Sequence, residues 1–505
     1  MYEKSGECKI MLPLRVHSWA DNLGLMPFFA LLFLANSYRL KQRGLLARYR
    51  RRLPGIGRPC ASRISGPKLK MAAAIPFRCF RIANRPLFAT FIAKNRTASM
   101  PSSKKLAIFT DSYPYGSAEP FLKTELEYLS KDFAHITLIP LSYGTSRAMR
   151  ELPANVTAVR PILTSSKDKG ELLVKGLINC SPAASYMGCL GNEHARASSK
   201  SLWSWGIGLL LSRAVLANSD VKRILRDASV GTLYFYWGIR SSYIIPLLPA
   251  GLGKKIAVRF HGSDTYEETN GGYIPLRTEQ LMRMDMAFFC SDFGRKYVRN
   301  RYPFMESKST LSRLGVLHKG YGKASSDGIF RIVTLSNMVP LKRLDLLANA
   351  LKECTARIEW THIGDGETRQ EVEAIASEFP NNITARFLGR IPNESVISYM
   401  TTSPIDLFVN VSSSEGVPVS IMEALSFGIP VLATAVGGTP EIVDNAVGQL
   451  VVPAITPKEL ASHISQLAAS APALLQKREN ARSRWEERCN AEMLYQAFST
   501  RLLNL

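Results

Sequence analysis

Short apolar runs alternate along the chain with segments whose apolar residues recur at helical spacing, beginning near residue 105. An apolar run at 106–109 precedes a turn-rich loop, apolar positions three or four residues apart follow between 122 and 133, and a second run spans 136–139. Short apolar runs suit buried strands, whereas the longer spacing is typical of one helix face. The pattern predicts a strand, a helix and a strand, which together form a parallel sheet with a helix on its face.

The alternation continues in two series that are separated by a polar stretch rich in Gly and Ser at 318–328. Further strands are expected before it at 233–236, 256–260, 287–290 and 311–314, and after it at 332–335, 358–363, 385–388, 407–409 and 431–433. Two such series predict an α/β fold made of two Rossmann-like, doubly wound parallel-sheet domains facing a cleft.

The alternation weakens between about 151 and 230, where one apolar stretch stands out at 202–216. This stretch predicts a buried helix, and a surface that faces lipid or an acceptor is the alternative.

These patterns divide the chain into four parts. Residues 101–320 are expected to form an N-terminal domain, residues 328–475 a C-terminal domain, and residues 476–505 a helix that packs across both. Residues 1–100 differ, because they hold 19 Lys and Arg against 3 Asp and Glu and so carry +16 of the total net charge of +23. We expect this basic extension to lie outside the fold, with a signal-peptide or membrane-surface segment as the alternative.

Cysteine, histidine and charge distribution argue against three classes of site: disulfides, protein-built metal sites and nucleic-acid-binding surfaces. Eight cysteines are scattered without a C-x-x-C pair, and seven histidines are isolated, so a disulfide framework and a protein-built metal site have little support. Most of the positive charge lies in the first fifth of the chain, and no basic and aromatic residues are interleaved on a nucleic-acid-binding module. We therefore expect no nucleic-acid partner.

The strongest motif lies at 414–425, where a strand is expected to end and a helix to begin. Gly416, Val417 and Pro418 form the predicted helix start, since glycine allows close backbone approach and proline suits the first helical position. Exposed N–H groups at such a start bind a diphosphate without a metal. Glu415 precedes this start, where a donor sugar would lie, and Glu423 follows within the helix, where its carboxylate can accept hydrogen bonds from a ribose diol.

This motif resembles the signature of two glutamates separated by seven residues in the retaining family 4 glycosyltransferases of GT-B fold. Four further segments resemble motifs of that family: 334–345, 362–367, 387–392 and 436–441. The motifs occur in the order that the family has. The resemblance covers about 105–505, strongly in its C-terminal half and loosely in its N-terminal half.

Carried over by position, the resemblance implies that Lys342 neutralises the donor diphosphate, with Arg343 beside it. A leaving nucleoside diphosphate needs charge stabilisation, and the chain offers no clear Asp-x-Asp to hold a metal. The sequence departs from the family at Asn337, where an arginine is common. Asn337 can donate a hydrogen bond but brings no charge, so the expectation is that Arg343 or Arg313 compensates, and weaker donor binding is the alternative.

In the N-terminal half, the segment 259–264 resembles the family's histidine-containing loop that faces the donor sugar. His261 would then hydrogen-bond the sugar or position the acceptor, and a histidine satisfied by backbone groups is the alternative. Gly116, in the loop 111–119, corresponds to the glycine that faces the diphosphate across the cleft. The segment 236–238 lines the acceptor side or belongs to an aromatic core.

The resemblance implies a glycosyltransferase that transfers a sugar from a nucleotide-diphosphate sugar to a glycan or lipid-linked acceptor with retention of configuration. No cofactor and no metal are expected, and Glu415 would stabilise developing positive charge on the sugar. The expected location is the cytoplasm, and peripheral association with the cytoplasmic face of a membrane is the alternative. The alternatives are another GT-B enzyme such as a nucleotide-sugar epimerase, and a non-catalytic nucleotide-sugar-binding partner protein.

Overall fold

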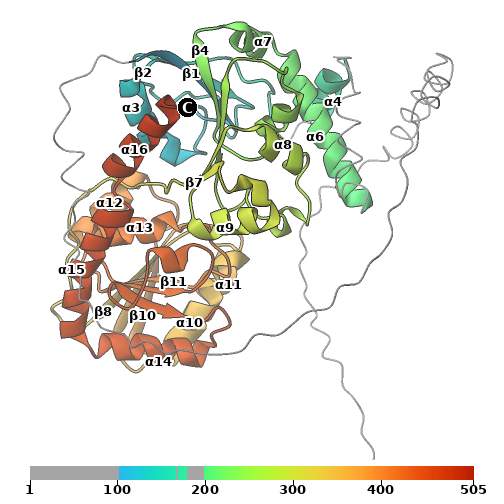
Figure 1. Ribbon diagram of the computed structural model, residues 1–505. Helices are drawn as coiled ribbons and strands as arrows, with labels where there is room; N and C mark the ends of the chain where they lie inside the picture. The colour runs from blue at the N-terminus through green and yellow to red at the C-terminus, as the bar shows by residue number, and fades with distance from the viewer. Residues whose placement is uncertain (1–101, 166–168, 179–197) are drawn as a thin grey trace, which may run out of the picture. The chain divides into compact units, whose positions relative to one another are not determined.

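The computed structural model describes residues 102–165, 169–178 and 198–505, and it builds two parallel sheets from them (Figure 1). The predicted basic extension 1–100 lies outside the described residues. The predicted α/β class with two Rossmann-like parallel sheets is confirmed.

The first sheet has seven strands in the order β3-β2-β1-β4-β5-β6-β7, and all its pairings are parallel. Its strands are β1 Ser102–Thr110, β2 Phe133–Pro140, β3 Val156–Ala158, β4 Val230–Phe235, β5 Lys255–Phe260, β6 Met286–Phe289 and β7 Ser309–Leu311. Its helices are α3 Pro120–Asp132, α4 Lys169–Ile178, α6 Ser199–Ala217, α7 Ser219–Arg226, α8 Arg277–Arg283 and α9 Asp292–Arg301.

The second sheet has six parallel strands in the order β10-β9-β8-β11-β12-β13. They are β8 Phe330–Leu335, β9 Ile358–Ile363, β10 Ile383–Phe387, β11 Leu407–Asn410, β12 Val431–Thr434 and β13 Gly448–Val451. The helices that follow β8 along the chain are α10 Leu344–Lys352, α11 Arg369–Ala376, α12 Asn393–Thr402, α13 Val419–Ser426, α14 Pro457–Ala468, α15 Ala471–Arg488 and α16 Ala491–Leu503. The strand order reverses between β8 and β11, and a reversal of this kind opens a crevice at the carboxyl ends of the strands.

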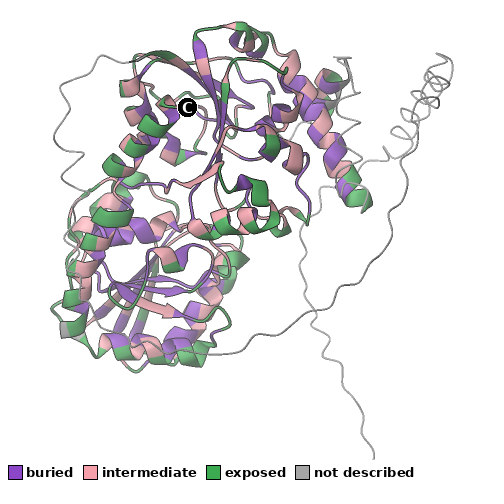
Figure 2. Ribbon diagram, viewed as in Figure 1, coloured by how far each residue is buried: buried purple, intermediate pink, exposed green. Residues whose placement is uncertain are grey.

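Helices cover both faces of these sheets, and this explains why the strands appear in the sequence as unbroken apolar runs. Every residue of β11 and of β12 is buried, and Figure 2 shows the central strands buried while the outer faces of the helices are exposed.

The C-terminal segment consists of two helices that serve different sheets. Trp485 of α15 belongs to the core of the second sheet, whereas Phe498 and Leu502 of α16 belong to the core of the first. The helices are separate because the Asn490 side chain accepts a hydrogen bond from the N–H of Glu492 and so caps the start of α16.

Helix α6 covers the apolar stretch in which a buried helix was expected, and it buries about half of its residues. Leu202 remains 44% exposed on it. None of the helices in the described part of the chain has the length and apolar character needed to cross a bilayer.

A fully buried ion pair joins α3 to β5 inside the first domain. Arg259 Nη2 lies 3.2 Å from Glu125 Oε2, and neither side chain is exposed. Tyr234 donates a hydrogen bond to Glu125, and the Arg259 guanidinium lies over the Phe498 ring of α16. This network connects strand β5 to helix α3 and to the C-terminal helix α16.

Replacing Glu125 by Gln should lower the free energy of unfolding by about 3–5 kcal/mol, because it leaves the buried Arg259 cation without a counter-charge. Urea unfolding of the variant and of the wild type measures this difference. Glu127→Gln on the exposed side of the same helix is the matched control. Equal losses in the two variants would contradict a buried charge pair.

Candidate functional site

A small pocket opens at the carboxyl edge of the second sheet, where the strand order reverses. It is lined by residues from the ends of β8 and β11 and from the loops that follow them: Thr334, Leu335, Ser336, Lys342, Leu344, Val409, Asn410, Val411 and Ser412. Ligands bind at this position in doubly wound sheets. Lys342, one of the predicted site residues, belongs to the pocket wall.

The structure brings Lys342 and Glu415 into direct contact, although 73 positions separate them. Lys342 Nζ donates to Glu415 Oε1 at 2.7 Å, and the two side chains are 21% and 10% exposed. The Asn410 side chain donates to the same oxygen at 3.2 Å. Two residues of the pocket lining, Lys342 and Asn410, therefore hold the Glu415 carboxylate, and sequence analysis did not identify Asn410.

Arg343 lies beside Lys342 but serves the backbone. Its guanidinium donates to the carbonyl oxygens of Val411, Ser412 and Pro453 at 2.6, 3.3 and 2.7 Å. It therefore braces the loop after β11 against the loop after β8. Its predicted role in donor binding stays a prediction, and the described contacts give it a structural one.

The helix start at 416–418 packs against Gly437 and Gly438, which lie in the turn after β12. Helix α13 begins at Val419, one residue later than expected, with Pro418 as its cap residue. Gly438 donates its N–H to the carbonyl oxygen of Gly416 at 2.6 Å. A Cβ on Gly437 would overlap the carbonyl oxygen of Glu415. The turn after β12 is thus packed against the backbone of Glu415, which fixes where its side chain emerges.

Glu423 lies on α13 and is half-buried. Removal from water raises the pKa of this carboxyl group from 4.5 to about 7. A carboxylic acid with such a pKa changes its charge near neutral pH, as is common for groups in binding sites.

His261 lies next to the Glu415 loop from the side of the first sheet. It follows β5, and the adjacent Gly262 is so close to Gly416 that a Cβ on either glycine would lie 3.1–3.2 Å from the other's backbone. The imidazole lies tilted against Tyr236 and Trp237, with ring centroids 4.8 and 4.3 Å away. Neither ring nitrogen has a hydrogen-bond partner among the described residues, and Nδ1 lies 3.7 Å from Asp264 Oδ2, so Nε2 is the nitrogen that remains for a ligand or for water.

The loop 111–119 after β1 is organised by a glutamate that sequence analysis did not single out. Glu119 accepts hydrogen bonds from the backbone N–H groups of Asp111, Ser112 and Tyr113, and from the Trp237 indole N–H. This one carboxylate therefore joins the loop to the aromatic residues that surround His261.

Gly116 and Asn337 lie outside the Lys342–Glu415 contact. Gly116 has a φ of +64°, and a Cβ there would meet the Thr145 hydroxyl at 2.9 Å, so its described neighbours belong to its own domain. Asn337 is exposed, and its side-chain oxygen accepts a hydrogen bond from Arg390 at 3.2 Å. Arg313, proposed to compensate for Asn337, instead pairs with Glu441 at 2.6 Å.

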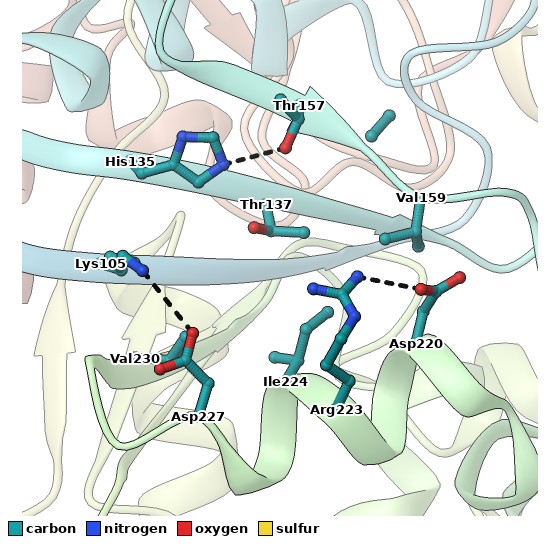
Figure 3. Close-up of a pocket in the computed structure, with 11 residues that line it drawn as sticks. Lys105, His135, Thr137, Thr157, Val159, Asp220, Arg223, Ile224, Asp227 and Val230 are labelled. Carbon is teal, nitrogen blue, oxygen red and sulfur yellow. Dashed lines mark hydrogen bonds and ion pairs between the residues drawn. The ribbon is translucent and has the colours of Figure 1, made fainter.

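A second, larger cavity of about 420 Å³ lies at the opposite, amino edge of the first sheet (Figure 3). Its charged side chains already pair with one another: Lys105 with Asp227 at 3.7 Å, and Arg223 with Asp220 at 2.9 Å. We therefore place the candidate site at the smaller pocket, where the predicted residues meet.

Comparison with known proteins places part of the chain in a known family. Residues 323–484 match the family model described as Glycosyl transferases group 1. The amylovoran biosynthesis glycosyltransferase AmsK of Erwinia amylovora is 23% identical over 231 residues, which are 43% of this chain and 55% of AmsK. The chain thus spans about half the length of the curated relatives it matches.

Two solved structures share the fold. HepE of Anabaena in complex with UDP superposes with a TM-score of 0.54 at 16% identity, over 80% of this chain and 100% of HepE. Sucrose-phosphate synthase of Thermosynechococcus elongatus superposes with a TM-score of 0.58 at 16% identity, over 79% and 98% of the two chains.

Proposed function

Residues 323–484 belong to the glycosyl transferases group 1 family, and from this premise we propose that the chain is a retaining glycosyltransferase with a nucleotide-diphosphate sugar as donor. The observation that carries the proposal is the contact of Lys342 with Glu415 at the carboxyl edge of the second sheet. The Lys342 ammonium group can neutralise a leaving diphosphate, and the Glu415 carboxylate can stabilise positive charge that develops on the sugar.

The donor would bind to the second domain. Its diphosphate would lie near Lys342 and the start of α13, where backbone N–H groups favour anions, and its ribose would lie near Glu423. This arrangement supplies positive charge from protein groups, so we propose a reaction without a metal cofactor. HepE, which shares the fold, was solved with UDP, and this supports a nucleotide donor.

The acceptor would enter from the first domain and meet the sugar beside His261. His261 Nε2, which has no hydrogen-bond partner among the described residues, can hydrogen-bond a sugar or an acceptor hydroxyl. AmsK is named for the biosynthesis of a polysaccharide, and this supports a glycan or lipid-linked acceptor.

We place the reaction in the cytoplasm, with peripheral contact to a membrane as part of the proposal. The net charge of +16 on residues 1–100 supports such contact, because basic segments are attracted to an anionic membrane surface.

A binding screen of UDP-, GDP- and ADP-sugars against the full chain, with and without a chelator, tests the proposal. We expect one nucleotide class to bind with equal affinity in both conditions and to release its nucleoside diphosphate during turnover. If no nucleotide sugar binds, the proposed function is wrong. If binding disappears with the chelator, metal independence is wrong.

A further inference from the structure

Asn410, the last residue of β11, connects two parts of the candidate site. It is 8% exposed, and its side-chain oxygen accepts a hydrogen bond from the backbone N–H of Ser412 at 3.1 Å. Its amide nitrogen donates to Glu415 Oε1 at 3.2 Å. Because a backbone N–H can only donate, the amide oxygen must face Ser412, and the amide nitrogen must therefore face Glu415.

The turn between Asn410 and Glu415 is held in place by groups outside it. The carbonyl oxygens of Val411 and Ser412 accept hydrogen bonds from Arg343, and the N–H of Ser413 donates to the carbonyl oxygen of Leu341 at 2.9 Å. The backbone that joins the two side chains is therefore braced, and the orientation of the Glu415 carboxylate depends on its side-chain partners.

Glu415 Oε1 accepts hydrogen bonds from Lys342 and Asn410, and a bound donor is expected to affect these two bonds differently. Lys342 is a flexible cation that lines the pocket, so a bound diphosphate would compete with Glu415 for its ammonium group. Asn410 is neutral, buried and fixed by Ser412. It would keep its hydrogen bond to Glu415 when Lys342 turns away.

We propose that Asn410 is a positioning residue, which holds the Glu415 carboxylate toward the donor sugar once Lys342 has turned to the diphosphate. This inference rests on the proposed function. It adds the residue that keeps Glu415 in place while Lys342 binds the diphosphate. Misplacement of a reacting group by about 1 Å costs on the order of 10²-fold in rate, so loss of Asn410 affects turnover more than donor binding.

Three variants of the full chain test this inference. Asn410→Leu removes both hydrogen bonds at similar volume, and Asn410→Asp adds a carboxylate next to Glu415. Asn349→Leu is the matched control, since among the described residues the Asn349 amide bonds only to the carbonyl oxygen of Asp345 in its own helix. Release of nucleoside diphosphate from the nucleotide sugar that the wild type uses gives kcat and KM.

We expect Asn410→Leu to lower kcat by about 10- to 100-fold and to leave KM within about threefold. Asn410→Asp keeps an acceptor for the Ser412 N–H but offers Glu415 an acceptor in place of a donor, so it should lower kcat at least as much. The control should leave kcat and KM unchanged.

The inference is overturned if kcat of Asn410→Leu stays within about twofold of the wild type. It is also overturned if kcat and KM change only as the folded fraction does, or if Asn410→Asp keeps the kcat of the wild type. A wild type that neither binds nor cleaves any nucleotide sugar shows instead that the proposed function fails, and the role of Asn410 fails with it.

Discussion

Replacing Glu415 by Gln is expected to lower turnover by a factor on the order of 10² to 10³ while nucleoside diphosphate binding stays as strong or becomes stronger. The amide keeps the size of the side chain but removes the negative charge that would stabilise the sugar in the transition state. It also releases Lys342, which pairs with Glu415 at 2.7 Å in the free protein. The freed ammonium group can then serve the diphosphate without first giving up a carboxylate.

The opposite directions of these two effects make the prediction specific. Steady-state kinetics with the nucleotide sugar give kcat, and calorimetric titration with the nucleoside diphosphate gives the affinity. Glu394→Gln, at an exposed position on α12, is the control for replacement of a glutamate and should leave both values unchanged. A parallel fall of kcat and affinity in Glu415→Gln would mean that Glu415 shapes the pocket and has no separate role in the reaction.

Much of the fold could be predicted because local pattern and global packing agree. Strands buried on both faces appear as apolar runs, and the helices between them show one apolar face. The spacing of Glu415 and Glu423 around a helix start was readable for the same reason, since it depends only on residues within one strand–loop–helix unit.

The contacts that complete the site could not be predicted, because they join loops that are distant in the sequence. Arg343 adopts a φ of +49° and reaches carbonyl groups up to 110 positions away. Arg390 meets Asn337 across 53 positions. Asn410 appears in the sequence as the end of a strand, and its role depends on a turn that returns Glu415 to it. These contacts depend on how the strand ends align in the sheet, and the local sequence pattern does not predict that alignment.

Glu423 provides the second large effect, which is a dependence on pH of both nucleotide affinity and protein stability. The two quantities are expected to change in opposite directions as the pH rises. Burial raises its pKa to about 7. The ionised carboxylate is the form that accepts two hydrogen bonds from a ribose diol, so nucleotide affinity should fall as the pH is lowered through 7. Glu423→Gln should bind more weakly at pH 8, by about 10- to 100-fold, and its affinity should vary little between pH 6 and 8.

The stability of the free protein should respond in the opposite direction. The folded state holds the Glu423 proton up to about pH 7, whereas the unfolded chain releases it near 4.5. Stability is therefore lost as the pH rises through this window, by at most about 3 kcal/mol at pH 8. Glu423→Gln carries no such charge and should melt at a higher temperature than the wild type at pH 8, with little difference at pH 5.

Thermal melts at the two pH values, together with titrations of the nucleotide at pH 6, 7 and 8, measure both effects in the same samples. Glu371→Gln, at an exposed position of α11, controls for the removal of one negative charge and should change neither. A variant that is more stable and binds more weakly at pH 8 would mean that the half-buried charge of Glu423 is maintained for the ligand at the expense of the fold. A variant that is less stable at both pH values would instead assign Glu423 to packing and remove the ribose contact from the proposed site.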